Sequence, residues 1–457
     1  MIFLPTSVQV FRFLHTGALD EVMAASEPEF VIPPAGSKYE ITIPVDVGGS
    51  PLHELNVNRA RYRAWETLFK VSCQALGKVS TSFRLRHEMQ ERARKDRTPG
   101  LREALEKIAN SLRAAPGIFQ HYKRTAIRKL GVDPEMARLI AKIKPRFLLL
   151  PSSLYDPFTN DAIVAGHALG VPTVVLQTGW DNPSSKGSIA RQPDHFGVWS
   201  EQSLRHVRDM QFCDEDRLFV IGSPYYETYV RRKPTATKEA RKRFGMPTEG
   251  PVVLLGGSFR QFDEVALLQR LEAAIDAGEL PKMTLFYRPH PGRQLREELN
   301  FFDTSWKYTM LDPEIEQVYK TNQEGKKAFQ HTYDLERVAD LLTAVDVTIS
   351  PLSSISLESL LMGTPVLGIC YNDGRNPWGP DVTSQMEHYR DMERVPAVRM
   401  CRNPDAIIGD LRKMLELARD PESANMAREG ARYFVDNGSR PYGQQLADFV
   451  ATRFFGA

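Results

Sequence analysis

The sequence contains little cysteine and no long apolar run. Its 457 residues include only Cys73, Cys213, Cys370 and Cys401, and no two of them form a CxxC pair. Such sparse cysteines argue against a disulfide framework and a structural zinc site, and they suit a reducing cytoplasm. No stretch approaches the roughly 18 apolar residues that a membrane-spanning helix needs.

Several catalytic signatures are also absent. The sequence has no GxxxxGK[ST] phosphate loop, no GxGxxG after a strand, no HExxH and no GxSxG. These absences argue against P-loop ATPases, simple dinucleotide enzymes, zincin proteases and α/β-hydrolases. No DxD-type acidic pair follows a mid-domain strand, so we expect neither an obligatory metal nor a cofactor.

The charge is nearly balanced overall but uneven along the chain. Lys and Arg number 59 against 57 Asp and Glu, a net charge of +2, which argues against a dedicated nucleic-acid binder. Between residues 84 and 129 there are 13 basic against 5 acidic residues, an excess of 13 − 5 = +8. Two interpretations stay open: a solvated helical face, or a patch for anionic lipid head groups.

Short apolar runs alternate with longer amphipathic segments, which is typical of parallel sheets covered by helices. Residues 58–130 have few strand signals and predict a helical insertion. The pattern predicts two consecutive doubly wound α/β domains, with ligands at the carboxyl ends of their strands. The expected strands, of which Glu40–Val45 has the weakest signal, are Ile2–Leu4, Glu29–Ile32, Glu40–Val45, Phe147–Leu150, Thr173–Gln177, His195–Val198, Leu218–Ile221, Val252–Leu255, Thr284–Arg288, Val345–Ser350, Pro365–Ile369 and Val395–Arg399.

The most informative segment is a strand that ends at Ser350 and is followed by a serine-rich helix start. A helix N-terminus carries unpaired N–H groups and a partial positive charge, so it favours a phosphate. A carboxylate in the next turn is suited to accept hydrogen bonds from a ribose diol. The alternative is that the serines only cap the helix. The candidate donor-binding residues here are Ser353, Ser354, Ser356 and Glu358.

Two further strand ends carry candidate donor-binding groups. The strand at 284–288 ends in a proline-rich turn that brings Arg288, His290 and Arg293 together, and arginine suits bidentate contact with phosphate. A lone histidine in such a turn has a structural alternative. The strand at 252–255 ends in glycines, and Gly257 with Ser258 allows close approach of a ligand to the backbone.

The loop after the strand at 173–177 carries the candidate acceptor-side groups, which are Trp180, Asp181, Asn182, Ser185 and Lys186. Asp181 is suited to act as a general base for an attacking hydroxyl. Because Asp-Asn-Pro is itself turn chemistry, an Asx-type turn is an equal alternative.

Taken together, these segments resemble a known superfamily. The run from residue 331 to residue 365 resembles the nucleotide-binding half of GT-B glycosyltransferases. Residues 288–291, Arg-Pro-His-Pro, are similar to the RxHP element of the branch that contains CDP-glycerol glycerophosphotransferases and relatives of the non-hydrolysing UDP-GlcNAc 2-epimerases. The loop at 180–187, with residues 198–203 and 221–224, resembles bacterial envelope glycosyltransferases. The resemblance covers about residues 145–450, and its motifs specify the fold better than the substrate.

The resemblance implies a GT-B fold, in which two Rossmann-like domains face each other across a cleft. We expect residues 1–224 to form the acceptor-side domain, with the helical insertion at about 58–130. Residues 225–440 would bind the donor, and a helix at 441–457 would cross back. By resemblance, His290 and the turn at 353–356 hold the donor phosphates, and Glu358 holds the ribose. The glycerophosphotransferases have a histidine in the loop at 180–182, so Asp181 is the nearest match for the base.

We therefore expect an inverting, metal-independent glycosyltransferase with Asp181 and His290 as catalytic residues. It would transfer a sugar from a nucleotide-sugar donor to a bacterial surface glycan, such as capsule or lipopolysaccharide, or to a lipid-linked acceptor. It would be cytoplasmic, with an anionic membrane surface as a further partner, and would bind no nucleic acid. The alternatives are an NDP-sugar epimerase, a glycerophosphotransferase-like polyol-phosphate transferase, and a catalytically silent sugar-nucleotide binding protein.

Overall fold

The protein is described by a computed structural model that covers residues 1–37, 39–56, 58–92, 101–258, 262–290, 301, 304–317, 334–375 and 377–456. It divides into two compact units. The first unit comprises Met1–Glu227 and Phe434–Ala457, and the second comprises Thr228–Tyr433. The boundaries expected from the sequence are 224/225 and 440/441, and the first unit of the structure extends a few residues beyond each of them.

The first unit is built on a seven-stranded sheet in the order β3-β2-β1-β4-β5-β6-β7, and every neighbouring pair is parallel. The order reverses between β1 and β4, which makes this the switch point of the sheet. The strands are β1 (Ile2–Phe3), β2 (Phe30–Ile32), β3 (Leu52–Glu54), β4 (Leu148–Ser152), β5 (Thr173–Gln177), β6 (His195–Val198) and β7 (Leu218–Val220).

Helices cover both faces of this sheet, and their ends follow local chemistry. Asp133 caps α7, whose first residue is a proline, and Asp156 caps α8 in the same way. The helices are α1 (Ser7–Val10), α2 (Asp20–Ala25), α3 (Arg59–Leu76), α4 (Thr81–Arg92), α5 (Leu101–Arg113), α6 (Phe119–Leu130), α7 (Pro134–Ile143), α8 (Pro157–Leu169), α9 (Asn182–Ser185), α10 (Glu201–His206) and α22 (Tyr442–Val450), while α11 (Glu227–Arg231) crosses the division between the units.

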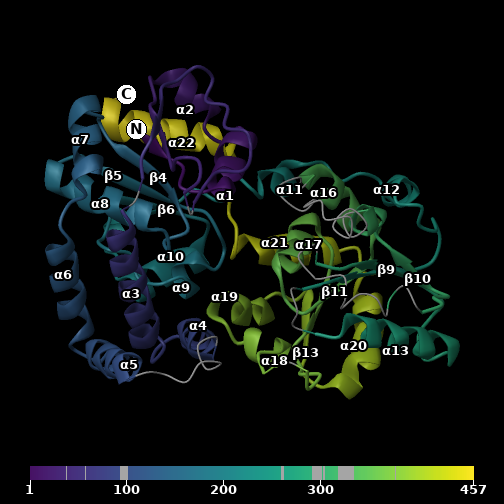
Figure 1. Cartoon of the computed structure of the whole chain (residues 1–457). Helices are drawn as coiled ribbons and strands as arrows, with labels where there is room; N and C mark the ends of the chain where they lie inside the picture. Colours follow the sequence, from purple (N-terminus) through teal and green to yellow (C-terminus); the bar gives the residue numbers. More distant parts are fainter. Residues whose placement is uncertain are drawn as a thin grey trace. The chain divides into compact units, whose positions relative to one another are not determined.

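The central strands of the first unit are buried on both faces. Leu148 and Leu150 of β4 face a core shared with α7 and α8, while Leu149 faces a second core. The second core includes Tyr442 and Leu446 of α22. Figure 1 shows α22, in yellow, beside α2, in purple, although about 420 residues separate them along the chain. The late helix therefore completes one side of a sheet that begins at residue 2.

The second unit contains a six-stranded, wholly parallel sheet in the order β10-β9-β8-β11-β12-β13. Its strands are β8 (Val252–Gly256), β9 (Thr284–Arg288), β10 (Thr309–Leu311), β11 (Val347–Ser350), β12 (Val366–Ile369) and β13 (Val398–Cys401). Its helices are α12 (Thr237–Arg243), α13 (Glu264–Asp276), α16 (Leu335–Ala344), α17 (Ser354–Met362), α18 (Pro380–Thr383), α19 (Glu387–Arg390), α20 (Ile407–Leu417) and α21 (Ser423–Arg432).

One core of the second unit lies between the sheet and two helices. Val253 and Leu255 of β8 face this core with Leu271 of α13 and Leu411 of α20. In Figure 1, α13 and α20 lie on one side of the sheet and α16 and α17 on the other. The helices on the second side include α17, whose first turn is the predicted phosphate-binding segment.

Most of the expected strands are present, and one is wrong. Residues 40–45 form no strand, and this part of the first unit has an irregular backbone. Two strands were missed, namely β3 and β10. Both are edge strands with exposed or half-buried side chains, so they lack the apolar run that marks a buried strand.

Candidate functional site

The predicted donor site lies at the switch point of the second sheet. The order of strands reverses between β8 and β11, and β9 lies on the other side of β8. The loop after β8 contains Ser258, the loop after β9 contains His290, and the loop after β11 contains Ser353. Because all three strands are parallel, the three loops leave the same edge of the sheet.

The two glycines after β8 allow the neighbouring segments to approach closely. A Cβ atom on Gly257 would lie 2.9 Å from the backbone nitrogen of His290. A Cβ atom on Gly256 would lie 2.8 Å from Cγ2 of Ile355, in the first turn of α17. The backbone N–H of Gly257 also donates a 2.8 Å hydrogen bond to the carbonyl of Arg288. The glycines thus bring the β9 turn and the start of α17 against the same two residues.

A buried carboxylate holds the loop after β8. Glu264 is 1% exposed and accepts hydrogen bonds of 2.8 Å from the backbone N–H of Ser258 and from the hydroxyl of Tyr287. Among the described residues, the hydroxyl of Ser258 is buried and has no hydrogen-bond partner. An unpartnered buried hydroxyl costs about 1–3 kcal/mol. A ligand with an acceptor oxygen at this position would recover that energy.

The serines at the start of α17 divide into two groups. Ser353 caps the helix, and its backbone N–H donates to the hydroxyl of Ser356 over 3.4 Å. Ser356 is fully buried, so these two serines serve the helix cap that the alternative interpretation expected. Ser354 is exposed at the first helical position. Glu358 is buried one turn further on, on the same side of the helix as Ser354.

Arg288 belongs to an ion-pair network inside the second unit. Its guanidinium contacts the carboxylates of Asp312, which is fully buried, and Glu314, the latter at 2.9 Å. Arg337 contacts the same two carboxylates. Burial pushes the pKa of Asp312 upward, but the two guanidinium groups outweigh it and hold that pKa below its usual value. Arg288 therefore joins the end of β9 to residues after β10.

In the first unit, two of the expected acceptor-side residues are used for packing. Trp180 is 7% exposed, donates its indole N–H to the side-chain oxygen of Gln202 over 2.8 Å, and packs edge-on against Phe434. Asn182 is buried, and its side-chain oxygen accepts a 2.5 Å hydrogen bond from the backbone N–H of Gly179. The turn interpretation thus holds for Asn182.

The other members of this loop form a small polar cluster. The carboxylate of Asp181 accepts a 2.7 Å hydrogen bond from the hydroxyl of Ser185 and lies 2.9 Å from the ammonium group of Lys186. Asp181 and Lys186 are about one-third exposed, whereas Ser185 is buried. The cluster presents an oriented carboxylate at the carboxyl end of β5, which is the position the sequence predicted for a base.

Within the ranges that the structure covers, no group of three or more His, Cys, Asp or Glu side chains is arranged to hold a metal ion. No helix in those ranges is both long enough and apolar enough to cross a bilayer. Arg293 and the start of the segment that resembles the nucleotide-binding half, residues 331–333, lie outside the described residues.

No protein-family model matches the sequence, and no curated protein does. Solved structures match over nearly the whole chain. One, from Listeria monocytogenes and assigned as a UDP-N-acetylglucosamine 2-epimerase, has a TM-score of 0.54 at 11% identity and covers 100% of this chain and 96% of that one. A structure of S. aureus MnaA with UDP has a TM-score of 0.51 at 10% identity, covering 99% and 95%.

The chain has the GT-B fold. This confirms the expected fold class of two doubly wound α/β units, and the order of the strands in both sheets agrees with it. A glycosyltransferase from Rickettsia africae also matches, with a TM-score of 0.48 at 12% identity over 99% of this chain and 97% of that one.

Proposed function

We propose that this GT-B protein is a glycosyltransferase. It would transfer a sugar from a nucleotide-sugar donor to a bacterial surface glycan, with inversion and without a metal. The observation that carries the proposal is the meeting of three strand-end loops in the second unit. There, the hydroxyl of Ser258, which has no hydrogen-bond partner among the residues that the structure describes, lies in the loop beside the β9 turn that carries His290, at the edge where α17 begins. Such an edge suits a nucleoside diphosphate.

The proposed donor contacts use the groups at this edge of the sheet. The positive end of α17, with the exposed Ser354, is suited to the phosphates. His290 would stabilise the charge of the leaving diphosphate, and Glu358 would accept hydrogen bonds from the ribose. Arg288 would act through its ion pairs with Asp312 and Glu314 by fixing the β9 turn.

The proposed reaction is a single displacement. Asp181 takes the proton of the acceptor hydroxyl as that oxygen bonds to the anomeric carbon of the donor. The bond from that carbon to the phosphate oxygen breaks, and the nucleoside diphosphate leaves with the electron pair. Attack opposite the leaving group inverts the anomeric centre. Ser185 and Lys186 would orient the carboxylate of Asp181.

We also propose that the first unit binds an anionic membrane surface through α5. Leu105, Ile108 and Leu112 lie on one face of this helix and are all more than half exposed. They occur within the segment 84–129 that carries the basic excess of +8. An exposed apolar row on a helix within a basic segment is typical of a helix that lies in the interface of anionic lipids. Such binding would bring the enzyme to a lipid-linked acceptor.

A thermal-shift screen against UDP, CDP, GDP, CMP and their sugars tests the donor assignment. A nucleotide at 100 times its dissociation constant should stabilise the fold by about 2.7 kcal/mol. If no nucleotide raises the melting temperature, the donor site is wrong.

The second candidate function is epimerisation, because proteins of this fold include one assigned as an epimerase. Incubating the stabilising nucleotide sugar without an acceptor separates the two. Net conversion to an epimer would exclude simple transfer. If Asp181→Asn retains nucleotide binding but loses turnover, the catalytically silent alternative is excluded as well.

A further inference from the structure

A cavity in the first unit lies apart from every residue that the sequence singled out. It has a volume of about 480 Å³, which is within the range of about 300–1,000 Å³ found for small-molecule sites. Its walls come from the residues after β2 and β3 and from α3, and Phe158 of α8 contributes from beyond β4. The cavity thus opens at the carboxyl edge of the first sheet, where ligands of open α/β sheets bind.

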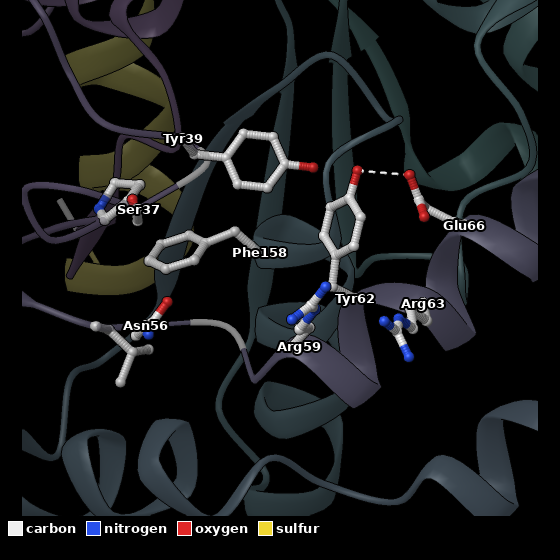
Figure 2. A pocket seen from close by; sticks show the side chains of 10 residues that line it. Ser37, Tyr39, Asn56, Arg59, Tyr62, Arg63, Glu66 and Phe158 are labelled. Carbon is white, nitrogen blue, oxygen red and sulfur yellow. Dashed lines mark hydrogen bonds between the residues drawn. The ribbon is translucent and has the colours of Figure 1, made fainter.

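Aromatic rings form much of this cavity. Figure 2 shows the rings of Tyr39, Tyr62 and Phe158 around one space. The centroids of Tyr39 and Tyr62 are 5.8 Å apart, and the hydroxyl of Tyr62 donates a 2.7 Å hydrogen bond to Glu66. Burial and hydrogen bonding to Tyr62 raise the pKa of Tyr39, so its hydroxyl stays uncharged. Aromatic faces attract the C–H groups on the flat side of a sugar ring, while the hydroxyl groups bind its oxygens.

Two arginines of α3, Arg59 and Arg63, add positive charge to the wall. Neither guanidinium makes an ion pair or a hydrogen bond with any residue that the structure describes. With Glu66 as the acidic lining residue, the charge of the lining is 2 − 1 = +1. Arginine is suited to planar, bidentate binding of a carboxylate or a phosphate.

Arg59 and Arg63 lie in the first five residues of α3. Arg59 is the first residue of α3, and the first turn contains no acidic residue. Cations at the positive end of a helix cost about 0.3–1 kcal/mol. Arg61, between them, is buried and fully used by Asp161, Asp133 and two backbone carbonyls. The contacts of Arg61 thus explain its presence by a role in the fold, whereas no such contact with a described residue explains Arg59 or Arg63.

We infer that this cavity binds a sugar ring that carries an anionic group, a carboxylate or a phosphate, and that this sugar belongs to the acceptor. The rings of Tyr39 and Tyr62 hold the sugar, and Arg59 with Arg63 holds the anion. Ser37, Asn56 and Glu66 are the remaining polar lining residues for its hydroxyls. The assignment of this sugar to the acceptor rests on the proposed function, since the proposed donor contacts all lie in the second unit. The binding of a charged sugar by the cavity does not depend on it.

Isothermal titration with four probes tests this inference on the full chain. The probes are methyl β-D-glucuronide, glucose 6-phosphate, neutral methyl β-D-glucoside and inorganic phosphate. We expect at least one charged sugar to bind about tenfold more tightly than both the neutral sugar and phosphate. Whether the glucuronide or glucose 6-phosphate binds shows whether the anion is a carboxylate or a phosphate. Equal binding of charged and neutral sugars, phosphate binding as tight as that of the charged sugars, or no binding at all would overturn the inference.

Variants separate the site from the fold. Arg59→Ala with Arg63→Ala should weaken the charged sugar at least about tenfold without lowering the melting temperature. Tyr39→Ala should weaken it as well, whereas Arg128→Ala, at an exposed arginine of α6, should not. Unchanged affinity in the double arginine variant overturns the inference. Nucleotide stabilisation, measured in parallel, reports on the donor site alone, so the two proposals fail separately.

Discussion

The backbone N–H of Ser223 donates a 2.8 Å hydrogen bond to the side-chain oxygen of Asn437, a residue 214 positions later in the sequence. The amide nitrogen of Asn437 returns a 3.0 Å hydrogen bond to the carbonyl of Ser223 and also contacts Glu227. Asn437 is 1% exposed. This pair fastens the returning segment to the end of the first sheet.

Replacing Asn437 by Ala should lower the free energy of unfolding by about 2–4 kcal/mol, because it leaves buried backbone groups of Ser223 without partners. Urea denaturation measures the loss. Asn425→Ala, at an exposed position of α21, is the matched control and should stay within about 0.5 kcal/mol of the parent chain. Equal effects of the two changes would contradict the role of the pair.

Gly257→Ala should abolish nucleotide stabilisation in the thermal-shift assay. The new methyl group would lie 2.4 Å from the carboxylate of Glu264 and 2.9 Å from the backbone of His290, so the two loops must separate. At Gly409, in α20, the new methyl group of Gly409→Ala would have no described atom within 4 Å apart from its own helix backbone, so this control should stabilise the fold by about 0.5–1 kcal/mol. A Gly257→Ala variant that binds nucleotide like the parent would remove the support for this donor site.

His290→Ala should lower kcat by about 100-fold and shift the melting temperature by less than about 2 °C, because its proposed role is to stabilise the leaving diphosphate. Arg288→Met, in contrast, should lower both activity and stability, because the ion pairs of Arg288 fix the β9 turn. It leaves the carboxylate of Asp312 buried with one partner fewer and should cost about 3–5 kcal/mol of stability. Steady-state kinetics and thermal melting of both variants make the comparison. Equal losses of activity and stability in His290→Ala would favour a structural role for the histidine.

The exposed row on α5 predicts membrane binding that a triple serine variant removes. Leu105→Ser, Ile108→Ser and Leu112→Ser together should reduce the fraction that sediments with anionic phosphatidylglycerol vesicles at least about fivefold. Leu169→Ser, at an exposed leucine of α8, is the control. Neutral phosphatidylcholine vesicles should bind the parent chain weakly, and the effect should fall with salt. Unchanged sedimentation of the triple variant would refute the membrane face.

Lys123 predicts an alkaline gain in stability. Its ammonium group is buried, donates a 2.7 Å hydrogen bond to Ser188, and has a pKa that burial lowers to about 8. Its unfolded pKa is near 10.5, so between pH 8 and 10.5 the unfolded chain holds more protons and stability rises with pH. We therefore compare the free energy of unfolding of Lys123→Met with that of the parent chain. The variant's value minus the parent's should be higher at pH 7 than at pH 10 by on the order of 2–3 kcal/mol. Urea denaturation at the two pH values measures this difference, and an identical difference at both would contradict it.

The sequence predicted the strand ends and the doubly wound pattern because the inner strands are buried on both faces and read as continuous apolar runs. It did not predict the partners of Arg288, since Asp312 and Glu314 follow β10, an edge strand with only half-buried side chains. It also gave no means of separating Ser353 and Ser356, which cap α17, from the exposed Ser354.

The cavity of the first unit was missed because its walls come from four short segments without a shared motif. Tyr39, Asn56, Arg59 and Phe158 lie in different elements, and only the fold brings them together. One signal was available: three arginines within the first five residues of a helix, which is the end that disfavours cations.

Because residues 434–457 return to the first unit, the two units can complete their folding only in a certain order during translation. The second unit is one continuous stretch, so its nascent chain can collapse as soon as it leaves the ribosome. Until α22 has been translated, one face of the first sheet lacks the packing of Tyr442, Leu446 and Val450. Its apolar side chains then remain accessible to chaperones. The part translated first is therefore the part that matures last.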